Sequence, residues 1–127
     1  MGDLSDDTGR PGSTQDILRR AGTVPPLSGF PPLDGLTAAF ETLRERHCDV
    51  IRARPVGASR RGEPIVMYSI GRGDASHLVV GGVHPNEPIG SWTALHLAEQ
   101  LADDDALRRA LNASWGIIPC IDPDGYR

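Results

Sequence analysis

The apolar positions after the first third of the chain alternate between helical and strand-like spacing. In LDGLTAAFETLRERHCD they recur every three or four residues, which predicts an amphipathic helix with Asp34 as its N-cap. His47 ends this apolar stripe, so we expect it to pack or to cap the helix. Two β-rich runs follow, DVIRARPVGAS and EPIVMYSIG, and the RRG between them predicts two strands joined by a short connection.

The second half of the chain has the pattern strand, helix, strand. In HLVVGGV every residue from Leu78 to Val83 is apolar or glycine, which predicts a strand buried on both faces of a helix-covered sheet. Helical spacing returns in IGSWTALHLAEQLADD. Its apolar side gathers Ala94, Leu95, Leu97, Ala98, Leu101 and Ala102, whereas His96 falls on the opposite side with Thr93, Gln100 and Asp103. We therefore expect His96 to face solvent.

The chain then closes a parallel pair of strands. DDDALRRALN predicts a short helix that stops at Asn112, and SWGIIPC predicts an apolar strand running into a Pro-Asp-Gly turn. A strand, a helix and a further strand imply a right-handed crossover. The expected fold class is therefore α/β, a partial mixed sheet with helices packed on it.

The N-terminal third differs in composition from the rest. Residues 1–33 are rich in Gly, Pro, Ser and Asp and have few periodic apolar positions, which predicts an arm with one short helix in TQDILRR. Residues 34–127 then form the folded domain. A chain of 127 residues with 39% hydrophobic content suits one small domain.

Charge and composition exclude several classes of function. A net charge of −4 provides no basic field for nucleic acid or an anionic membrane surface. The sequence has no apolar run long enough for a membrane span and no signal-peptide pattern, so we expect a cytoplasmic protein. Cys48 and Cys120 form no CxxC pair, and we expect both to be buried and reduced.

Two turns could carry chemistry. HPNEP follows the first strand of the parallel pair and IDPDGYR follows the second, so both lie where α/β sheets collect ligands. His84 and Glu87 are three residues apart across the first turn, and imidazole and carboxylate are ordinary zinc ligands. The alternative is structural: Glu87 would lie in the first turn of the following helix, where anions are favoured, and His84 would end the strand.

A family resemblance favours the metal site. From about Leu33 to Arg127 the chain resembles the N-terminal part of the zinc carboxypeptidase (M14) family of metallopeptidases. The matching segments, in the family's order and spacing, are LTAAFETLRERHCD, PVGASRRGEPIVMYSIG, HLVVGGVHPNEPIG, ALHLAEQL and GIIPCIDPDGYR. The resemblance implies that His84 and Glu87 are the first two ligands of a Zn²⁺ ion and that the reaction is metal-assisted amide hydrolysis.

The substrate class is open between two branches. Pro85 stands where the family more often has Gly, and Asp122 where it more often has Asn. Deacylases of the aspartoacylase and succinylglutamate desuccinylase type also use an H-x-x-E followed by Pro or similar residues. The substrate is thus a peptide or an acyl-amino acid, and DPDGY together with GASRRGEPI favours the peptidase.

The rest of the family's active site has no counterpart here. The third zinc ligand, the catalytic glutamate and the substrate clamps lie downstream of the Pro-Asp-Gly turn, so no residue is assigned a catalytic role. We expect Asp122 and Asp124 to bond local backbone amides. The resemblance implies that a C-terminal segment or a partner chain completes the site. A truncated, non-catalytic assembly module with an open sheet edge is the alternative.

Overall fold

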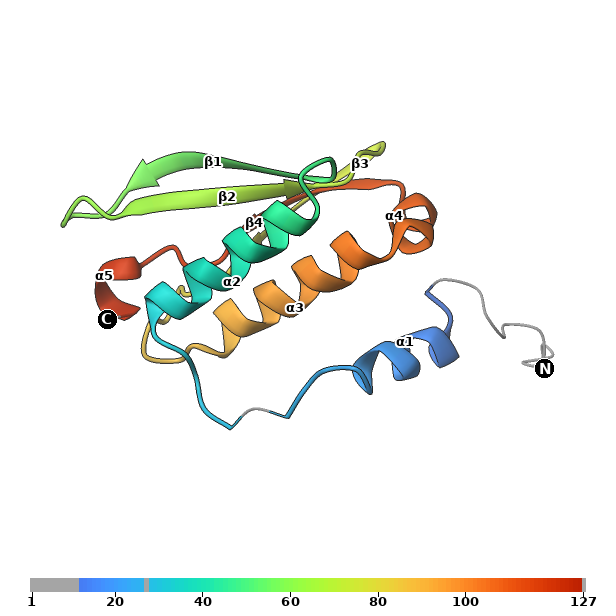
Figure 1. Cartoon of the computed structure of the whole chain (residues 1–127), viewed down its shortest axis with the longest axis horizontal. Helices are drawn as coiled ribbons and strands as arrows, with labels where there is room; N and C mark the ends of the chain where they lie inside the picture. Colours follow the sequence, from blue (N-terminus) through green and yellow to red (C-terminus); the bar gives the residue numbers. More distant parts are fainter. Residues whose placement is uncertain (1–11, 27, 127) are drawn as a thin grey trace.

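The computed structural model describes residues 12–26 and 28–126 (Figure 1). The elements in chain order are α1 (Thr14–Ala21), α2 (Leu33–Arg46), β1 (Ile51–Ala58), β2 (Pro64–Ile70), β3 (Ala75–Val80), α3 (Ile89–Asp103), α4 (Asp105–Leu111), β4 (Ala113–Ile118) and α5 (Pro123–Tyr126). Every helix and strand expected from the spacing of apolar residues is present. The short α5 was not expected.

The four strands form one mixed sheet in the order β1-β2-β4-β3. β1 and β2 are antiparallel, as the short connection predicted, and β2 also pairs antiparallel with β4. β3 and β4 are parallel, with α3 and α4 in the crossover between them. The α/β fold class is therefore confirmed, and the carboxyl ends of β3 and β4 lie at the same edge of the sheet.

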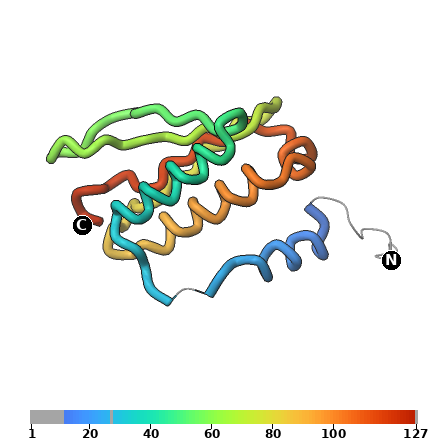
Figure 2. Tube along the Cα trace, viewed as in Figure 1, coloured from blue at the N-terminus to red at the C-terminus, as the bar shows by residue number. Residues whose placement is uncertain are grey.

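Helices α2 and α3 cover one face of this sheet (Figures 1 and 2). Their apolar stripes meet the strands in one core, whose most deeply buried large side chains include Leu36, Phe40, Ile70, Leu101 and Ile117. The predicted N-cap of α2 was wrong. The helix begins two residues earlier than a cap at Asp34 would place it, at Leu33, with Pro32 in the cap position and Asp34 inside the first turn. Burial of the Leu33 side chain against the core explains the earlier start.

The opposite face of the sheet is not covered by helices within the described residues, and the prediction for β3 was therefore wrong. Leu78 is 63% exposed and Val80 37% exposed, although both belong to an apolar run. Leu78 pairs with Gly116 of β4, and a Cβ on Gly116 would lie 2.9 Å from Met67 Sδ. Met67, Gly116, Leu78 and Val80 are called the outer patch below.

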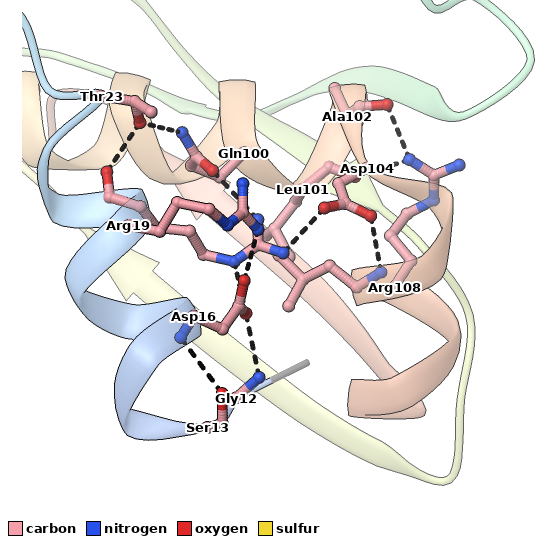
Figure 3. A network of polar contacts seen from close by, with 12 residues as sticks. Gly12, Ser13, Asp16, Arg19, Thr23, Gln100, Leu101, Ala102, Asp104 and Arg108 are labelled. Atoms are coloured by element: carbon pink, nitrogen blue, oxygen red, sulfur yellow. Dashed lines mark hydrogen bonds and ion pairs between the residues drawn. The ribbon is translucent and has the colours of Figure 1, made fainter. Parts of the chain in front are cut away.

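The described part of the N-terminal arm, with α1, lies against α3 on the side away from the sheet (Figures 1 and 3). The Ser13 hydroxyl caps α1 by accepting from Asp16 N at 3.1 Å. Arg20 then pairs with Asp16 (Nε–Oδ2 2.8 Å) and crosses to Asp104 (Nη2–Oδ2 2.7 Å), which is also the N-cap of α4. Arg20 Nη1 donates to Gln100 Oε1 at 3.1 Å. These contacts form the arm network.

The docked arm changes the environment of His96. Its side chain is only 17% exposed, so the prediction that it faces solvent was wrong. His96 Nδ1 lies 2.9 Å from Glu99 Oε2 and its ring stacks on Trp92 at 5.6 Å. Both rings line a groove of about 620 Å³ between α1 and α3. The helical projection of α3 was right, but it carried no information about a segment some 80 residues away.

The remaining predictions have mixed outcomes. His47 is the C-cap of α2, and its Nε2 lies 2.7 Å from Asp103 Oδ1, which agrees with a capping role. Both cysteines are free thiols, but Cys48 is exposed and only Cys120 is buried. Asn112 ends α4 in the left-handed conformation with φ 45°, as a helix stop should. Among the described helices, none has the length and apolarity needed to cross a bilayer.

Candidate metal centre

The two candidate turns lie side by side at the carboxyl edge of the parallel strands. Beyond the ladder of β3 and β4, Gly81 N donates to Ile118 O at 2.8 Å and Ile121 N donates to Gly81 O at 3.0 Å. The segments that leave the two strands therefore stay hydrogen bonded past the last ladder residues. This places HPNEP beside IDPDGYR, as the strand order predicted.

Gly81 and Gly82 allow this close approach. A Cβ on Gly81 would lie 2.5 Å from Pro119 O, and a Cβ on Gly82 would lie 2.7 Å from Cys120 Sγ. Gly82 also has φ +64°, in the left-handed region that disfavours other residues. The glycines are thus required by the junction, and they bring the start of the His84 turn onto the segment that follows β4.

His84 and Glu87 are the first and last residues of one β-turn. The turn is closed by Glu87 N donating to His84 O at 2.8 Å. Both side chains are exposed, and neither makes a hydrogen bond or ion pair with any residue the structure describes. Pro85 and Pro88 restrict the backbone on either side of Asn86 and Glu87. Two side chains of metal-binding type thus project from one restricted turn without a hydrogen-bond partner among the described residues.

The structural alternative for Glu87 does not hold. Helix α3 begins at Ile89 with Pro88 in the cap position, and its first turn contains no acidic residue. Glu87 therefore precedes the helix, and it does not sit in the first turn as that alternative required.

Asp122 and Asp124 both have structural partners. Asp122 Oδ1 accepts from Gly125 N at 3.0 Å, which starts α5 and agrees with the predicted local bonding. Asp124 instead reaches the β1–β2 connection: its Oδ1 accepts from the Ser59 hydroxyl at 2.7 Å and its Oδ2 from Arg61 N at 3.1 Å. The sequence reasoning missed this link, because no local spacing connects residues 59 and 124.

Cys120 is beside the turn but is not a suitable ligand. Burial raises the pKa of the Cys120 thiol, so the thiol stays protonated at neutral pH. Its sulfur packs where a Gly82 side chain would otherwise be. Cys120 also lines a small cavity of about 160 Å³ between α2, β2 and the end of β4. Its role here is packing.

The described residues offer two candidate zinc ligands and no third one beside them. The imidazole of His84 and the carboxylate of Glu87 fit the donor types that zinc takes. Within residues 12–26 and 28–126 no group of three His, Cys, Asp or Glu side chains could hold a metal ion. The other histidines are engaged elsewhere: His47 with Asp103, His96 with Glu99, and His77 with the Trp115 ring at 4.5 Å.

Sheet order and turn position together describe an α/β domain with a His-x-x-Glu turn at the carboxyl edge of its parallel strands. The sequence model of the zinc carboxypeptidase family matches residues 36–127. The chain belongs to this family.

Curated relatives agree with this assignment. Carboxypeptidase E of Caenorhabditis elegans is 28% identical over 104 residues, which are 72% of this chain and 22% of the relative. Carboxypeptidase SOL1 of Arabidopsis thaliana is 27% identical over 109 residues, 77% of this chain and 22% of the relative. The chain thus spans about a fifth of the length of these relatives.

Solved structures show the same fold at lower identity. Bovine thrombin-activatable fibrinolysis inhibitor, in complex with tick carboxypeptidase inhibitor, matches with a TM-score of 0.70 at 18% identity, over 77% of this chain and 33% of that chain. Carboxypeptidase A of Helicoverpa armigera matches with a TM-score of 0.68 at 18% identity, over 88% and 31%. The partial coverage agrees with an incomplete carboxypeptidase-like sheet.

Proposed function

We propose that this chain carries part of the zinc site of a carboxypeptidase-type amide hydrolase, with His84 and Glu87 as two of the ligands. The observation that carries the proposal is the turn itself. Two exposed side chains of zinc-binding type leave one β-turn at the carboxyl edge of the sheet, without partners among the described residues. Membership of the zinc carboxypeptidase family supports this role for them.

Zinc in such a site polarises the scissile carbonyl and lowers the pKa of a bound water. The chain's own contribution is to hold the ion at a fixed place on the sheet edge. Glu87 cannot serve as ligand and as general base at once, and the carboxylates of Asp122 and Asp124 are already occupied by backbone and hydroxyl donors. We propose that a C-terminal segment or a partner chain supplies the third ligand and the base.

A peptide is the favoured substrate over an acyl-amino acid. The relatives and the solved structures described above are carboxypeptidases or bear a carboxypeptidase inhibitor in their description. Among the residues of the turn, the deacylase branch rests on HPNEP, in which Pro88 follows the H-x-x-E and Pro85 stands where the peptidase family more often has Gly. A panel of peptides with free C-termini and of N-acyl amino acids, given to the same preparation, separates the two classes.

The test uses the chain together with any residues that its gene adds at either end. Wild type, His84→Ala and Glu87→Gln are compared for zinc binding by competition with a chromogenic chelator, and for release of the C-terminal residue from a peptide. We expect zinc affinity to fall by at least about 100-fold in either variant, because changes outside the ligand shell already cost about 10- to 100-fold. His47→Ala, whose ring pairs with Asp103, is the matched histidine control.

Two results would contradict the proposal. The first is zinc binding that survives in both variants with wild-type affinity. The second is zinc binding that His47→Ala lowers as much as His84→Ala does, because the bound metal would then lie elsewhere on the chain.

A further inference from the structure

The geometry points to Asp124 as a positioning residue that fixes the turn carrying His84 and Glu87. It acts through α5, which lies between the β1–β2 connection and that turn. The inference rests on the proposed function for the roles of His84 and Glu87. The contacts that carry it are independent of any metal.

The first contact joins α5 to the β1–β2 connection. Both oxygens of Asp124 are used: Oδ1 accepts from the Ser59 hydroxyl at 2.7 Å, and Oδ2 accepts from Arg61 N at 3.1 Å. Ser59 is itself fixed, because its Oγ accepts from Glu63 N at 3.0 Å and its N–H donates to Glu63 O at 2.8 Å. A carboxylate that accepts two bonds from a closed turn is held at two points.

The second contact joins α5 to the turn of His84. A Cβ added to Gly125 would lie 2.5 Å from Pro85 Cγ and 2.6 Å from Asp122 Oδ2. Gly125 and Pro85 therefore touch with no space between them. Asp122 fixes the other side of Gly125, since its Oδ1 accepts from Gly125 N at 3.0 Å. Any displacement of α5 must press on Pro85 or leave a void beside it.

Pro85 transmits this contact to both candidate ligands. It follows His84 directly and is a central residue of the turn that Glu87 N closes onto His84 O. One end of the molecule contains the carboxyl ends of β3 and β4, the β1–β2 connection and α5 (Figure 1). Asp124 therefore ties three segments, distant in sequence, around the turn from which the two donors leave.

The experiment compares Asp124→Ala, which removes both bonds, with Asp124→Asn, which keeps the shape and loses the charge. Asp105→Ala is the matched control, because Asp105 is an exposed carboxylate with two arginine partners in α4. The readouts are hydrogen exchange of the Glu87 amide without metal, and zinc affinity. We expect Asp124→Ala to raise the exchange rate and to lower zinc affinity by about 10-fold. Asp124→Asn should give a smaller change and Asp105→Ala none.

Ser59→Ala keeps the test decisive if Asp124→Ala does not fold. It removes one of the two bonds to Asp124, together with the bond that Ser59 Oγ accepts from Glu63 N, and should change both readouts in the same direction by less. Wild-type exchange of the Glu87 amide in these variants would overturn the inference, and so would unchanged zinc affinity where binding depends on His84 and Glu87. If wild-type zinc binding does not depend on them, the proposed function fails. The exchange of Glu87 still decides whether Asp124 holds the turn.

Discussion

Charged side chains are largely buried and paired in the arm network, whereas those of the His84 turn are exposed and unpaired among the described residues. In the arm network, Arg20 is 16% exposed and pairs with both Asp16 and Asp104 (Figure 3). In the turn, His84 and Glu87 are exposed and have no side-chain partner among the described residues. The first region uses its charges to hold two parts of the chain together. In the turn, the imidazole of His84 and the carboxylate of Glu87 have no partner among the described residues, so these side chains tie no two segments together.

The pKa values of the arm network show how strongly its charges are coupled. The hydrogen bond from Arg20 holds the pKa of Asp16 well below its usual range, and the amide of Gly12 adds to this. The same Arg20 bond lowers the pKa of Asp104, and the two carboxylates raise the pKa of Arg20. Each charged side chain in this network stabilises the fold through its oppositely charged partner. We therefore expect removal of a charge to lower the free energy of unfolding in the arm network, and to lower zinc affinity in the His84 turn.

The largest loss of stability should come from the backbone beneath the turn. Gly82→Ala places a Cβ at φ +64° and 2.7 Å from Cys120 Sγ. The left-handed conformation costs about 1–2 kcal/mol and the overpacking about 1–3 kcal/mol more. Urea unfolding should therefore show a loss of about 2–5 kcal/mol. Gly57→Ala in β1, where a Cβ meets nothing within 4 Å, is the control. Equal losses in both variants would show that the junction is not tightly packed.

The next largest effect belongs to the arm network. Arg20→Ala leaves Asp16 and Asp104 without their shared partner, and hydrogen bonds to charged groups contribute about 1.5–3 kcal/mol. Part of this is recovered when the arm leaves α3, so we expect a net loss of about 1–2 kcal/mol in thermal unfolding. Limited proteolysis should then cut near α1. Arg19→Ala, at a side chain 65% exposed, should cost less than about 0.5 kcal/mol. An Arg20 variant as stable and protease-resistant as wild type would contradict the docking role.

Low pH should lower the stability contributed by the arm network by less than Arg20→Ala does. The pKa values of Asp16 and Asp104 are lowered by folding, so their contribution is complete above about 3.9, the unfolded value, and is lost as the pH falls through the folded values. The readout is the difference in the free energy of unfolding between wild type and Arg20→Ala, measured by urea unfolding at each pH. This difference should be constant from pH 8 to about 5 and shrink below about 4. A difference that instead changes near neutral pH would assign the docking to other groups.

The smallest effect on stability should come from the candidate ligands. His84→Ala and Glu87→Gln remove exposed, unpartnered side chains, so each should shift the free energy of unfolding by less than about 0.5 kcal/mol. Metal-free protein is compared by urea unfolding. A loss above 1 kcal/mol, on the order of a buried hydrogen bond, would mean that these side chains support the fold. The difference between the arm network and the turn in their contribution to stability would then be contradicted.

Much of the fold followed from spacing along the chain. The helical period gave α2, α3 and α4, the short RRG connection gave the β1–β2 pair, and the crossover gave the parallel pair of β3 and β4. The candidate site followed from the same logic, because strand ends of a parallel pair share one edge. Local periodicity and chain topology are sufficient for these features, since each depends on neighbours in sequence.

Three of the errors concern which segments distant in sequence lie against one another and which do not. His96 was expected to face solvent because α3 was read alone, whereas the arm covers that side. Leu78 was expected to be buried because an apolar run does not say how many layers cover the strand. Asp124 was expected to bond its neighbours, although its partners are Ser59 and Arg61. A one-dimensional pattern does not contain these pairings.

The outer patch has a practical consequence for handling the protein. Leu78 and Val80 are exposed on β3, which is an edge strand of the sheet within the described residues, and Met67 lies beside Gly116 next to them. An apolar surface that adjoins unpaired backbone groups attracts other copies of the same surface. The net charge of −4 opposes this only while salt is low. Through this face, copies of the protein should therefore associate less in dilute buffer than in high salt.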